Sequence, residues 1–206
     1  MLAERRKSTI SLAMSLRVIA GSARGMRLKP VPGNKTRPIM DRVKEALFSI
    51  IGVDIRDANF LDLFAGTGSV GIEALSRGAA YAHFNDTDRQ AVQTIHRNLT
   101  HTGFKPKATV TRRHALYLIA RGPDRHYQYL YVAPPQYQGI WLKTLAALDE
   151  NRDWNRPGSQ VIVQIDPSEF DAKRRFDHLE EIDQRKYGRT MLVFYQFADW
   201  ERDSFD

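Results

Sequence analysis

The stretch NFLDLFAGTGSVGIE, from Asn59 to Glu73, decides the predicted fold. Its first half is a short apolar run, interrupted only by Asp62, which ends in the glycine turn Gly66 to Gly68. Such a run is typical of a buried strand in a parallel sheet, and the apolar residues after the turn recur at helical spacing. Strand, glycine turn and helix together form the unit that binds nucleotide-like cofactors at the carboxyl edge of an open α/β sheet.

Asp62 indicates which cofactor this turn would hold. Gly66, Gly68 and Gly71 match the pattern G-x-G-x-x-G, which is shared with dinucleotide-binding proteins. A carboxylate at the end of the strand would repel a diphosphate, whereas it suits the ammonium group of an amino acid. The segment from Asp62 to Gly68 resembles the first motif of S-adenosylmethionine-dependent methyltransferases. A buried aspartate that caps a turn in another α/β fold is the alternative. The residues predicted to bind the cofactor here are Asp62, Phe64, Ala65, Gly66, Thr67 and Gly68.

The composition limits the architecture and the chemistry. With 206 residues, of which 42% are hydrophobic and 27% charged, the chain has the size and composition of one soluble α/β domain with a small appendage. The absence of cysteine excludes disulfides, thiolate metal sites and cysteine nucleophiles. The six histidines show no paired metal-ligand spacing, so no metal is expected. No apolar run is long enough to span a bilayer, and a cytoplasmic protein without membrane contact is expected.

The positive charge of the chain is concentrated near its N-terminus. The net charge is +7, but Met1 to Lys44 alone hold eleven Lys and Arg against two acids, a net charge of +9, which leaves −2 for the other 162 residues. Such a concentration is expected of a nucleic-acid contact, although a solvated basic tail is the alternative for Arg5 to Lys7. The residues predicted to hold phosphates are Arg17, Arg24, Arg27, Arg37, Arg42 and Lys44.

The rest of the chain alternates between strands and helices. Predicted strands cover residues 60–64, 80–84, 108–111, 127–132 and 160–165, with helices between them, and the β-rich runs 182–186 and 191–197 form a terminal hairpin. This alternation predicts a mostly parallel sheet closed by an antiparallel hairpin. Residues 17–21 and 25–28 are expected to form a further hairpin. A helix is expected from about Asp41 to Gly52, with an apolar face made of Val43, Ala46, Leu47, Ile50 and Ile51.

Further positions at predicted strand ends suit an adenosine. Asp86 ends the second strand, where a carboxylate can accept hydrogen bonds from both ribose hydroxyls, and Thr87 follows it. This arrangement serves adenosylmethionine and NAD equally. His114 and Ala115 end the third strand, where adenine would bind, and an ordinary surface histidine is the alternative.

Pro134, Pro135, Gln136 and Tyr137 follow the fourth strand and form the predicted catalytic turn. Two consecutive prolines fix the backbone and direct the preceding carbonyls outward, since neither ring nitrogen can donate. A rigid carbonyl that accepts from an amino group helps an exocyclic base nitrogen to attack a sulfonium methyl, and an aromatic side chain can stack on the base. An ordinary proline turn between a strand and a helix is the alternative.

With these residues in place, the chain resembles the RsmD family, methyltransferases that modify a guanine N2 in bacterial small-subunit ribosomal RNA. The matching stretches run from about Leu16 to Phe197 and are residues 17–21 with 24–25, 36–38 with 41–45, 61–79, 86–88, the proline pair and 185–188. The resemblance implies a class I S-adenosylmethionine-dependent methyltransferase (Rossmann-like) fold. It also implies S-adenosylmethionine as cofactor and ribosomal RNA or the small-subunit particle as partner. The expected division is a flexible basic arm (1–15), an RNA-facing hairpin and helix (16–52), a methyltransferase domain (53–198) and a tail (199–206).

One departure from the family pattern concerns the catalytic turn. The family carries Asp-Pro-Pro followed by Phe or Tyr, whereas this chain carries Ala133-Pro134-Pro135-Gln136-Tyr137. The acid that would accept from the guanine amino group is therefore missing, and the Gln136 amide is a candidate substitute. His114 also replaces an acid that the family usually carries near adenine.

Three other functions are compatible with parts of this sequence. A DNA adenine or cytosine amino-methyltransferase would share the proline turn. A nicotinamide-dependent oxidoreductase would share the glycine pattern, although the Asp62 carboxylate would repel the diphosphate of its cofactor. An RNA-binding module that keeps the cofactor site but has reduced or lost catalysis is the alternative that Ala133 raises.

Overall fold

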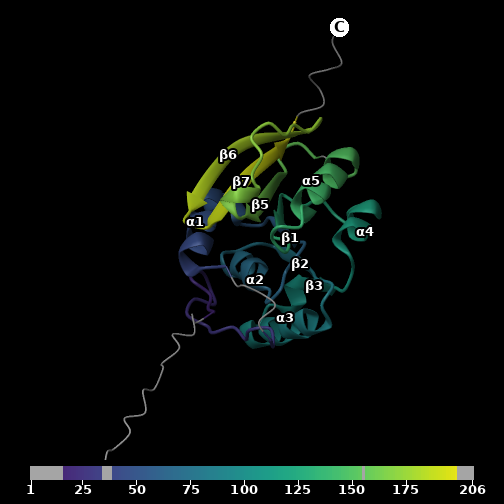
Figure 1. The fold of residues 1–206 in the computed structure, drawn as a ribbon. Coiled ribbons are helices and arrows are strands. Elements are labelled where there is room, and N and C mark those ends of the chain that lie inside the picture. The colour runs from purple at the N-terminus through teal and green to yellow at the C-terminus, as the bar shows by residue number, and fades with distance from the viewer. Residues whose placement is uncertain (1–15, 34–38, 155, 199–206) are drawn as a thin grey trace, which may run out of the picture.

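The computed structural model describes residues 16–33, 39–154 and 156–198 (Figure 1). The predicted arm 1–15, the predicted tail 199–206 and the candidate phosphate ligand Arg37 lie outside the described residues. Among the described residues, no helix is both long and apolar enough to cross a membrane, and no group of His, Asp and Glu side chains has the arrangement of a metal site.

In the described part of the chain, a seven-stranded sheet runs through the centre of the fold, in the order β3-β2-β1-β4-β5-β7-β6. The strands are β1 (Asn59–Asp62), β2 (Tyr81–Asn85), β3 (Ala108–Thr111), β4 (Tyr129–Val132), β5 (Gln160–Ile165), β6 (Leu179–Tyr187) and β7 (Thr190–Phe197). The first five are mutually parallel, and β7 lies antiparallel between β5 and β6. The predicted parallel sheet closed by an antiparallel C-terminal hairpin is therefore confirmed. The predicted bounds differ most at β1, which ends at Asp62, and at β6, which begins at Leu179.

Helices cover both faces of this sheet (Figure 1). They are α1 (Asp41–Ile51), α2 (Ser69–Ser76), α3 (Arg89–Thr102), α4 (Ala115–Ala120) and α5 (Ile140–Glu150), with short 3₁₀ turns at Gly52–Ile55, Lys105–Lys107 and Pro167–Glu169. Alternation along β1 directs Phe60 into one core and Leu61 into the other. The first core includes α1, α2, α3 and the N-terminal segment, and the second includes α4 and α5. Both cores are needed because strands of a parallel sheet are buried on both sides.

The predicted N-terminal hairpin is reduced to a short main-chain pairing. Leu28 N donates to the Leu16 carbonyl at 2.7 Å, and Val18 N donates to the Met26 carbonyl at 3.0 Å. Within residues 16–33, the described part of this segment, the only β-bridge joins Arg17 and Arg27. The antiparallel pairing is as expected, but it is shorter than the two expected runs because the next backbone N–H groups are bonded elsewhere: those of Ile19 and Ala20 donate to the Glu73 carboxylate on α2.

The buried face of α1 also differs from the prediction. Val43, Leu47 and Ile51 are buried as expected, but Ile50 is 40% exposed and Lys44 is fully buried. Lys44 lies on the same helical stripe as Leu47 and Ile51, and its Nζ donates to the Arg17 carbonyl at 2.6 Å. Its ammonium also lies 3.4 Å from the Glu73 carboxylate. Burial lowers the pKa of Lys44, and the nearby Glu73 charge opposes that shift.

Glu73 is thus the centre of a buried polar network that fastens the N-terminal segment to α2. Its carboxylate accepts from two backbone N–H groups and from Arg77 Nε at 2.9 Å, besides pairing with Lys44. Neither Lys44 nor Glu73 has an exposed side chain. Removing one partner of such a pair leaves an uncompensated charge inside the protein, which is strongly destabilising.

We expect Glu73→Gln to lower the free energy of unfolding by about 3 kcal/mol, because the buried Lys44 ammonium would lose its counter-ion. The measurement is the urea midpoint and slope of the variant against the wild type. Asp41→Asn is the control, since the Arg17–Asp41 pair is exposed and a pair of that kind contributes under about 1 kcal/mol. Equal midpoints for wild type and Glu73→Gln would contradict the anchoring role.

Candidate functional site

The carboxyl ends of β1, β2, β3 and β4 bring the predicted site residues to one edge of the sheet. In the register of the sheet, Asp62 at the end of β1 pairs with Phe84 on β2 and with Tyr131 on β4. The order of the strands reverses between β1 and β4, and in open α/β sheets ligands bind in the crevice at such a reversal. The glycine turn, 63–68, follows β1, and the proline turn, 133–139, follows β4, the two strands between which the order reverses.

The glycine turn is shaped by backbone conformations that favour glycine. Gly68 caps α2 with φ of 78°, and a Cβ on Gly71 would lie 2.3 Å from the Phe84 ring, so only glycine lets α2 pack this closely on β2. The turn is bonded to the neighbouring strand end, since Ala65 N donates to the Asn85 carbonyl and Gly66 N donates to Asp86 Oδ2 at 2.8 Å. The backbone path therefore suits close approach of a ligand.

Asp62 lies beneath this turn and carries an unsatisfied oxygen. The residue is 1% exposed, and its Oδ1 has no hydrogen-bond partner among the described residues. Burial raises the pKa of Asp62 to about 7; the backbone N–H groups of Gly71 and Phe64 oppose this shift, and the charge of Asp86 adds to it. A buried carboxylate with a vacant acceptor is expensive, and a cationic group beside it would lower that cost. The residue therefore fits a ligand with an ammonium group.

Asp86 is half-buried and belongs to the same arrangement. Its Oδ2 accepts from Gly66 N, and its Oδ1 accepts from Asp88 N at 2.9 Å. Each oxygen keeps a second lone pair, so the carboxylate is fixed in orientation and can still accept from a vicinal diol. The cap of α3 is Asp88, whose Oδ1 accepts from Gln90 N.

The other residues predicted to bind adenosine lie at the neighbouring strand ends. Thr87 is exposed, and its carbonyl accepts from Arg112 Nε at 3.0 Å. His114 is exposed at the start of α4 without a side-chain capping bond, while Ala115 is buried. The ring of His114 can therefore turn toward a ligand at this edge, and Ala115 contributes shape and backbone.

The proline turn holds Tyr137 in a fixed, exposed position. Pro134 is buried, Pro135 is exposed, and Tyr137 is 60% exposed with a left-handed φ of 63°. That φ is costly for a non-glycine residue, and two bonds hold it: Tyr137 N donates to Glu169 Oε1, and its hydroxyl donates to Asp166 Oδ2, both at 2.8 Å. The ring is therefore presented to solvent as a rigid flat surface.

Asp166, Glu169 and Arg189, which contact Tyr137, were not predicted from the sequence. Arg189 Nη2 donates to the Tyr137 hydroxyl at 3.3 Å, and its Nε lies 3.6 Å from Asp166 Oδ2. Bonds from Ser168 and from Tyr137 lower the pKa of Asp166 to about 2. In the sequence, only the Asp-Pro-Ser start of a short helical turn at Asp166 hinted at a fixed carboxylate. The contact with Arg189 depends on the β6–β7 turn returning to this edge.

Gln136 and Ala133 lie on either side of the proline pair. Gln136 is half-buried, and its amide makes no hydrogen bond to any other residue in the described ranges. Ala133 is half-buried and packs against the first core. The Gln136 amide can therefore serve as an acceptor, while a longer side chain at Ala133 would start from the rim of the core.

The predicted phosphate ligands divide into three groups. Arg17, Arg24, Arg27 and Arg42 are exposed, and Arg17 Nε also bonds Asp41 Oδ2 at 3.0 Å. Arg42 lies beside the β6–β7 turn, since its Nη2 would be 3.2 Å from a Cβ on Gly188. Lys44 was wrongly predicted, because its ammonium is buried against Glu73 and cannot reach a phosphate. Arg37 lies outside the described residues.

Comparisons with known proteins agree with this arrangement. A family model described as "Conserved hypothetical protein 95" matches residues 16–196. "Putative rRNA methyltransferase YlbH" of Bacillus subtilis is 34% identical over 183 residues, which are 88% of this chain and 98% of that protein. "Ribosomal RNA small subunit methyltransferase D" of Escherichia coli K12 is 39% identical over 137 residues, which are 66% of this chain and 68% of that protein.

Comparison with solved structures also finds methyltransferases. The solved structure of "Putative methyltransferase yhhF from Escherichia coli" superposes with a TM-score of 0.77 at 30% identity, over 89% of this chain and 98% of that one. The mixed seven-stranded sheet and this likeness confirm the predicted class I methyltransferase fold. With a family match that covers nearly all described residues, the chain belongs to the Conserved hypothetical protein 95 family, the RsmD family of methyltransferases.

Proposed function

We propose that this protein transfers a methyl group from S-adenosylmethionine to the exocyclic N2 of a guanine in small-subunit ribosomal RNA. The observation that carries the proposal is the buried Asp62 carboxylate with its vacant oxygen beneath the glycine turn. A dinucleotide would bring its pyrophosphate to this place, whereas adenosylmethionine brings an ammonium group. The names of the relatives, two of which describe ribosomal RNA methyltransferases, support the substrate class.

The residues of the glycine turn and the strand ends would hold the cofactor. Asp62 and the backbone of Gly66 to Gly68 suit the methionine end, Asp86 suits the ribose hydroxyls, and His114 with Ala115 suits adenine. The cofactor supplies an electrophilic methyl group on a sulfonium. Since Asp86 is already fixed by Gly66 and Asp88, little side-chain ordering is required on binding.

The proline turn would hold the base. No hydrogen bond to the carbonyl groups of Ala133 and Pro134 is found among the described residues, which leaves these groups available to accept from an exocyclic amino group. Hydrogen bonds accepted from that group orient the nitrogen and favour its attack, and the exposed Tyr137 ring offers a surface for stacking. Catalysis would then consist mainly of positioning.

The exposed arginines of the N-terminal segment would hold the RNA backbone. If they do, binding weakens steeply as salt rises, and Arg24→Ala, Arg27→Ala and Arg42→Ala together flatten the slope by about 0.7–0.9 for each phosphate that is no longer neutralised. Affinity for S-adenosylmethionine should not change. The measurement is RNA affinity at a series of salt concentrations, with Arg152→Ala, Arg156→Ala and Lys173→Ala, exposed on other parts of the surface, as a control of equal charge. An equal slope in wild type and the N-terminal triple variant would place the RNA elsewhere.

Two experiments test the proposed function against its rivals. Calorimetric titrations with S-adenosylmethionine and with NAD separate a methyltransferase from an oxidoreductase, and binding of NAD alone would overturn the cofactor assignment. Transfer of a labelled methyl group to small-subunit particles, naked ribosomal RNA and DNA then identifies the substrate class. Label that enters only DNA would favour the DNA amino-methyltransferase.

A further inference from the structure

A second stretch of the chain is strongly basic, in addition to the N-terminal segment. Between Arg89 and Pro123 there are seven Lys and Arg and no Asp or Glu. Residues 5–40 also contain no acid. The parts outside 1–44 and 89–123 hold 13 Lys and Arg against 22 Asp and Glu, a net charge of −9. The positive charge therefore belongs to two separate segments, and the fold brings them together.

The contact between these segments is built around Asn98 of α3, which is fully buried. Lys29 N donates to Asn98 Oδ1 at 2.8 Å, and Asn98 Nδ2 donates to the Lys29 carbonyl at 3.0 Å. The same Nδ2 donates to the Thr67 carbonyl at 2.9 Å. One side chain thus fixes the backbone of Lys29 relative to both α3 and the glycine turn of the cofactor site.

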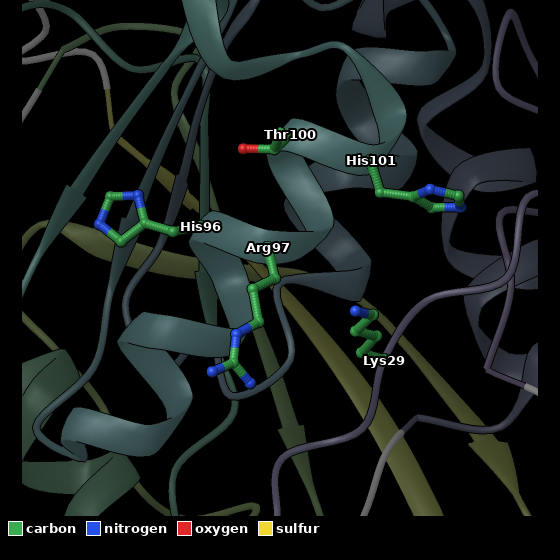
Figure 2. Close-up of a pocket in the computed structure, with 5 residues that line it drawn as sticks. All are labelled: Lys29, His96, Arg97, Thr100 and His101. Atoms are coloured by element: carbon green, nitrogen blue, oxygen red, sulfur yellow. The ribbon is translucent and has the colours of Figure 1, made fainter.

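An open pocket lies on the surface above this contact. It has a volume of about 410 Å³, and it is lined by Lys29 and by residues on the exposed side of α3 (Figure 2). They are Lys29, His96, Arg97, Thr100 and His101. All five are exposed and each can donate a hydrogen bond, and none is an acid. Cationic and hydroxyl donors around an open hollow are the complement of a phosphodiester.

We propose that this pocket binds backbone phosphates of the substrate RNA and forms a second anchor beside the cofactor edge. The inference rests on the proposed function, since it needs an RNA substrate. The Asn98 amide binds the backbone of both Lys29 and Thr67, which limits how far a phosphate bound by the side chains of Lys29 and Arg97 can lie from the glycine turn. Phosphate contacts of this kind set the position and direction of a strand without reading its sequence. The pocket would therefore fix where along the RNA the target base lies.

The test compares the double variant Lys29→Ala/Arg97→Ala with the charge-matched control Arg152→Ala/Lys173→Ala. The probe is small-subunit particles from cells lacking the gene, with binding measured from low to high salt. We expect the pocket variant to lose about tenfold or more in affinity and its salt slope to fall by about 1.4–1.8, the effect of leaving two phosphates without a cationic partner. The rate at saturating particle concentration and the affinity for S-adenosylmethionine should stay at the wild-type level. Lys29→Arg/Arg97→Lys should restore binding.

Each outcome of this test has a definite meaning. If the pocket variant and the control have equal salt slopes and equal affinities, and the wild type binds and methylates the particles, the pocket does not bind RNA phosphates. The proposed function would then still stand. A wild-type protein that binds no particle and transfers no methyl group overturns both. Should the double variant fold poorly, Arg97→Glu alone gives the same test, because Arg97 is an exposed helical position with no structural bond in the described ranges.

Discussion

Asp62→Asn is expected to stabilise the ligand-free protein at alkaline pH and to weaken its affinity for S-adenosylmethionine. Burial raises the pKa of Asp62 from 3.8 to about 7. Between these two values the unfolded chain has released a proton that the folded protein still holds, so stability falls as pH rises through this window. At about 1.4 kcal/mol for each pKa unit, the loss attributable to Asp62 is on the order of 4 kcal/mol.

The neutral amide of the variant does not titrate, so this loss should be absent. We therefore expect the difference in free energy of unfolding, Asp62→Asn minus wild type, to grow by about 4 kcal/mol between pH 4 and pH 8. Other groups, such as Asp166 with its lowered pKa, act in both proteins and cancel in the difference. Urea unfolding at each pH gives the measurement, and the exposed Asp54→Asn is the control.

Cofactor affinity should move in the opposite direction. Loss of a hydrogen bond to a charged group costs about 1.5–3 kcal/mol, or about ten- to a hundredfold in the dissociation constant. Two results together would contradict the assignment of Asp62 as the buried acceptor of an ammonium group. One is a difference in free energy of unfolding between variant and wild type that stays constant from pH 4 to pH 8, and the other is an unchanged affinity for S-adenosylmethionine.

Ala133→Asp is expected to raise the methylation rate by about a hundred- to a thousandfold, if the natural chain lacks the main acceptor for the guanine amino group. Ala133 is half-buried at the rim of the first core, next to the rigid proline pair. A carboxylate there would accept from the amino group in the transition state, where the nitrogen gains positive charge. The increase should appear in the chemical step and leave RNA affinity nearly unchanged, because phosphates dominate that affinity.

The size of the rate increase on Ala133→Asp depends on whether Gln136 already serves as the acceptor in the natural chain. If its amide oxygen replaces the missing acid, Gln136→Ala lowers the rate by at least about tenfold, and Ala133→Asp rescues the double variant. Single-turnover assays at saturating cofactor and RNA compare the wild type, both single variants and the double variant. Gln138→Ala, on the same turn and exposed, is the control. Equal, measurable rates in wild type and Gln136→Ala would refute the substitution. Activity only in proteins carrying Ala133→Asp would mean that the natural chain is an RNA-binding module without catalysis.

The parts of the fold that depend on local pattern could be predicted from the sequence. The glycine turn, the cap at Asp88 and the strands 108–111 and 160–165 are all encoded within a few residues of where they form. The position of Asp62 and Asp86 at one edge also follows, because strands on either side of a helical crossover are parallel and end at the same edge.

Other features depend on contacts between distant residues, which a sequence pattern does not reveal. Lys44 looked like a surface cation because lysine is almost never fully buried, yet Glu73, 29 positions later, supplies its counter-ion. Asp166 and Arg189 reach Tyr137 only because β7 runs antiparallel beside β5. The basic pocket on α3 forms because Asn98 binds the backbone of Lys29 and holds it against the helix. The polar face of α3 by itself does not indicate this contact.

The most direct test of the proposed function is to identify the nucleoside that the protein produces. Purified protein is incubated with S-adenosylmethionine carrying a deuterated methyl group and with small-subunit particles from cells lacking the gene. The ribosomal RNA is then digested to nucleosides and analysed by mass spectrometry. We predict a single labelled product, N2-methylguanosine, at no more than one per particle. Label on another base or on another atom of guanine, or no label from a protein that binds the cofactor and the particle, would contradict the proposal.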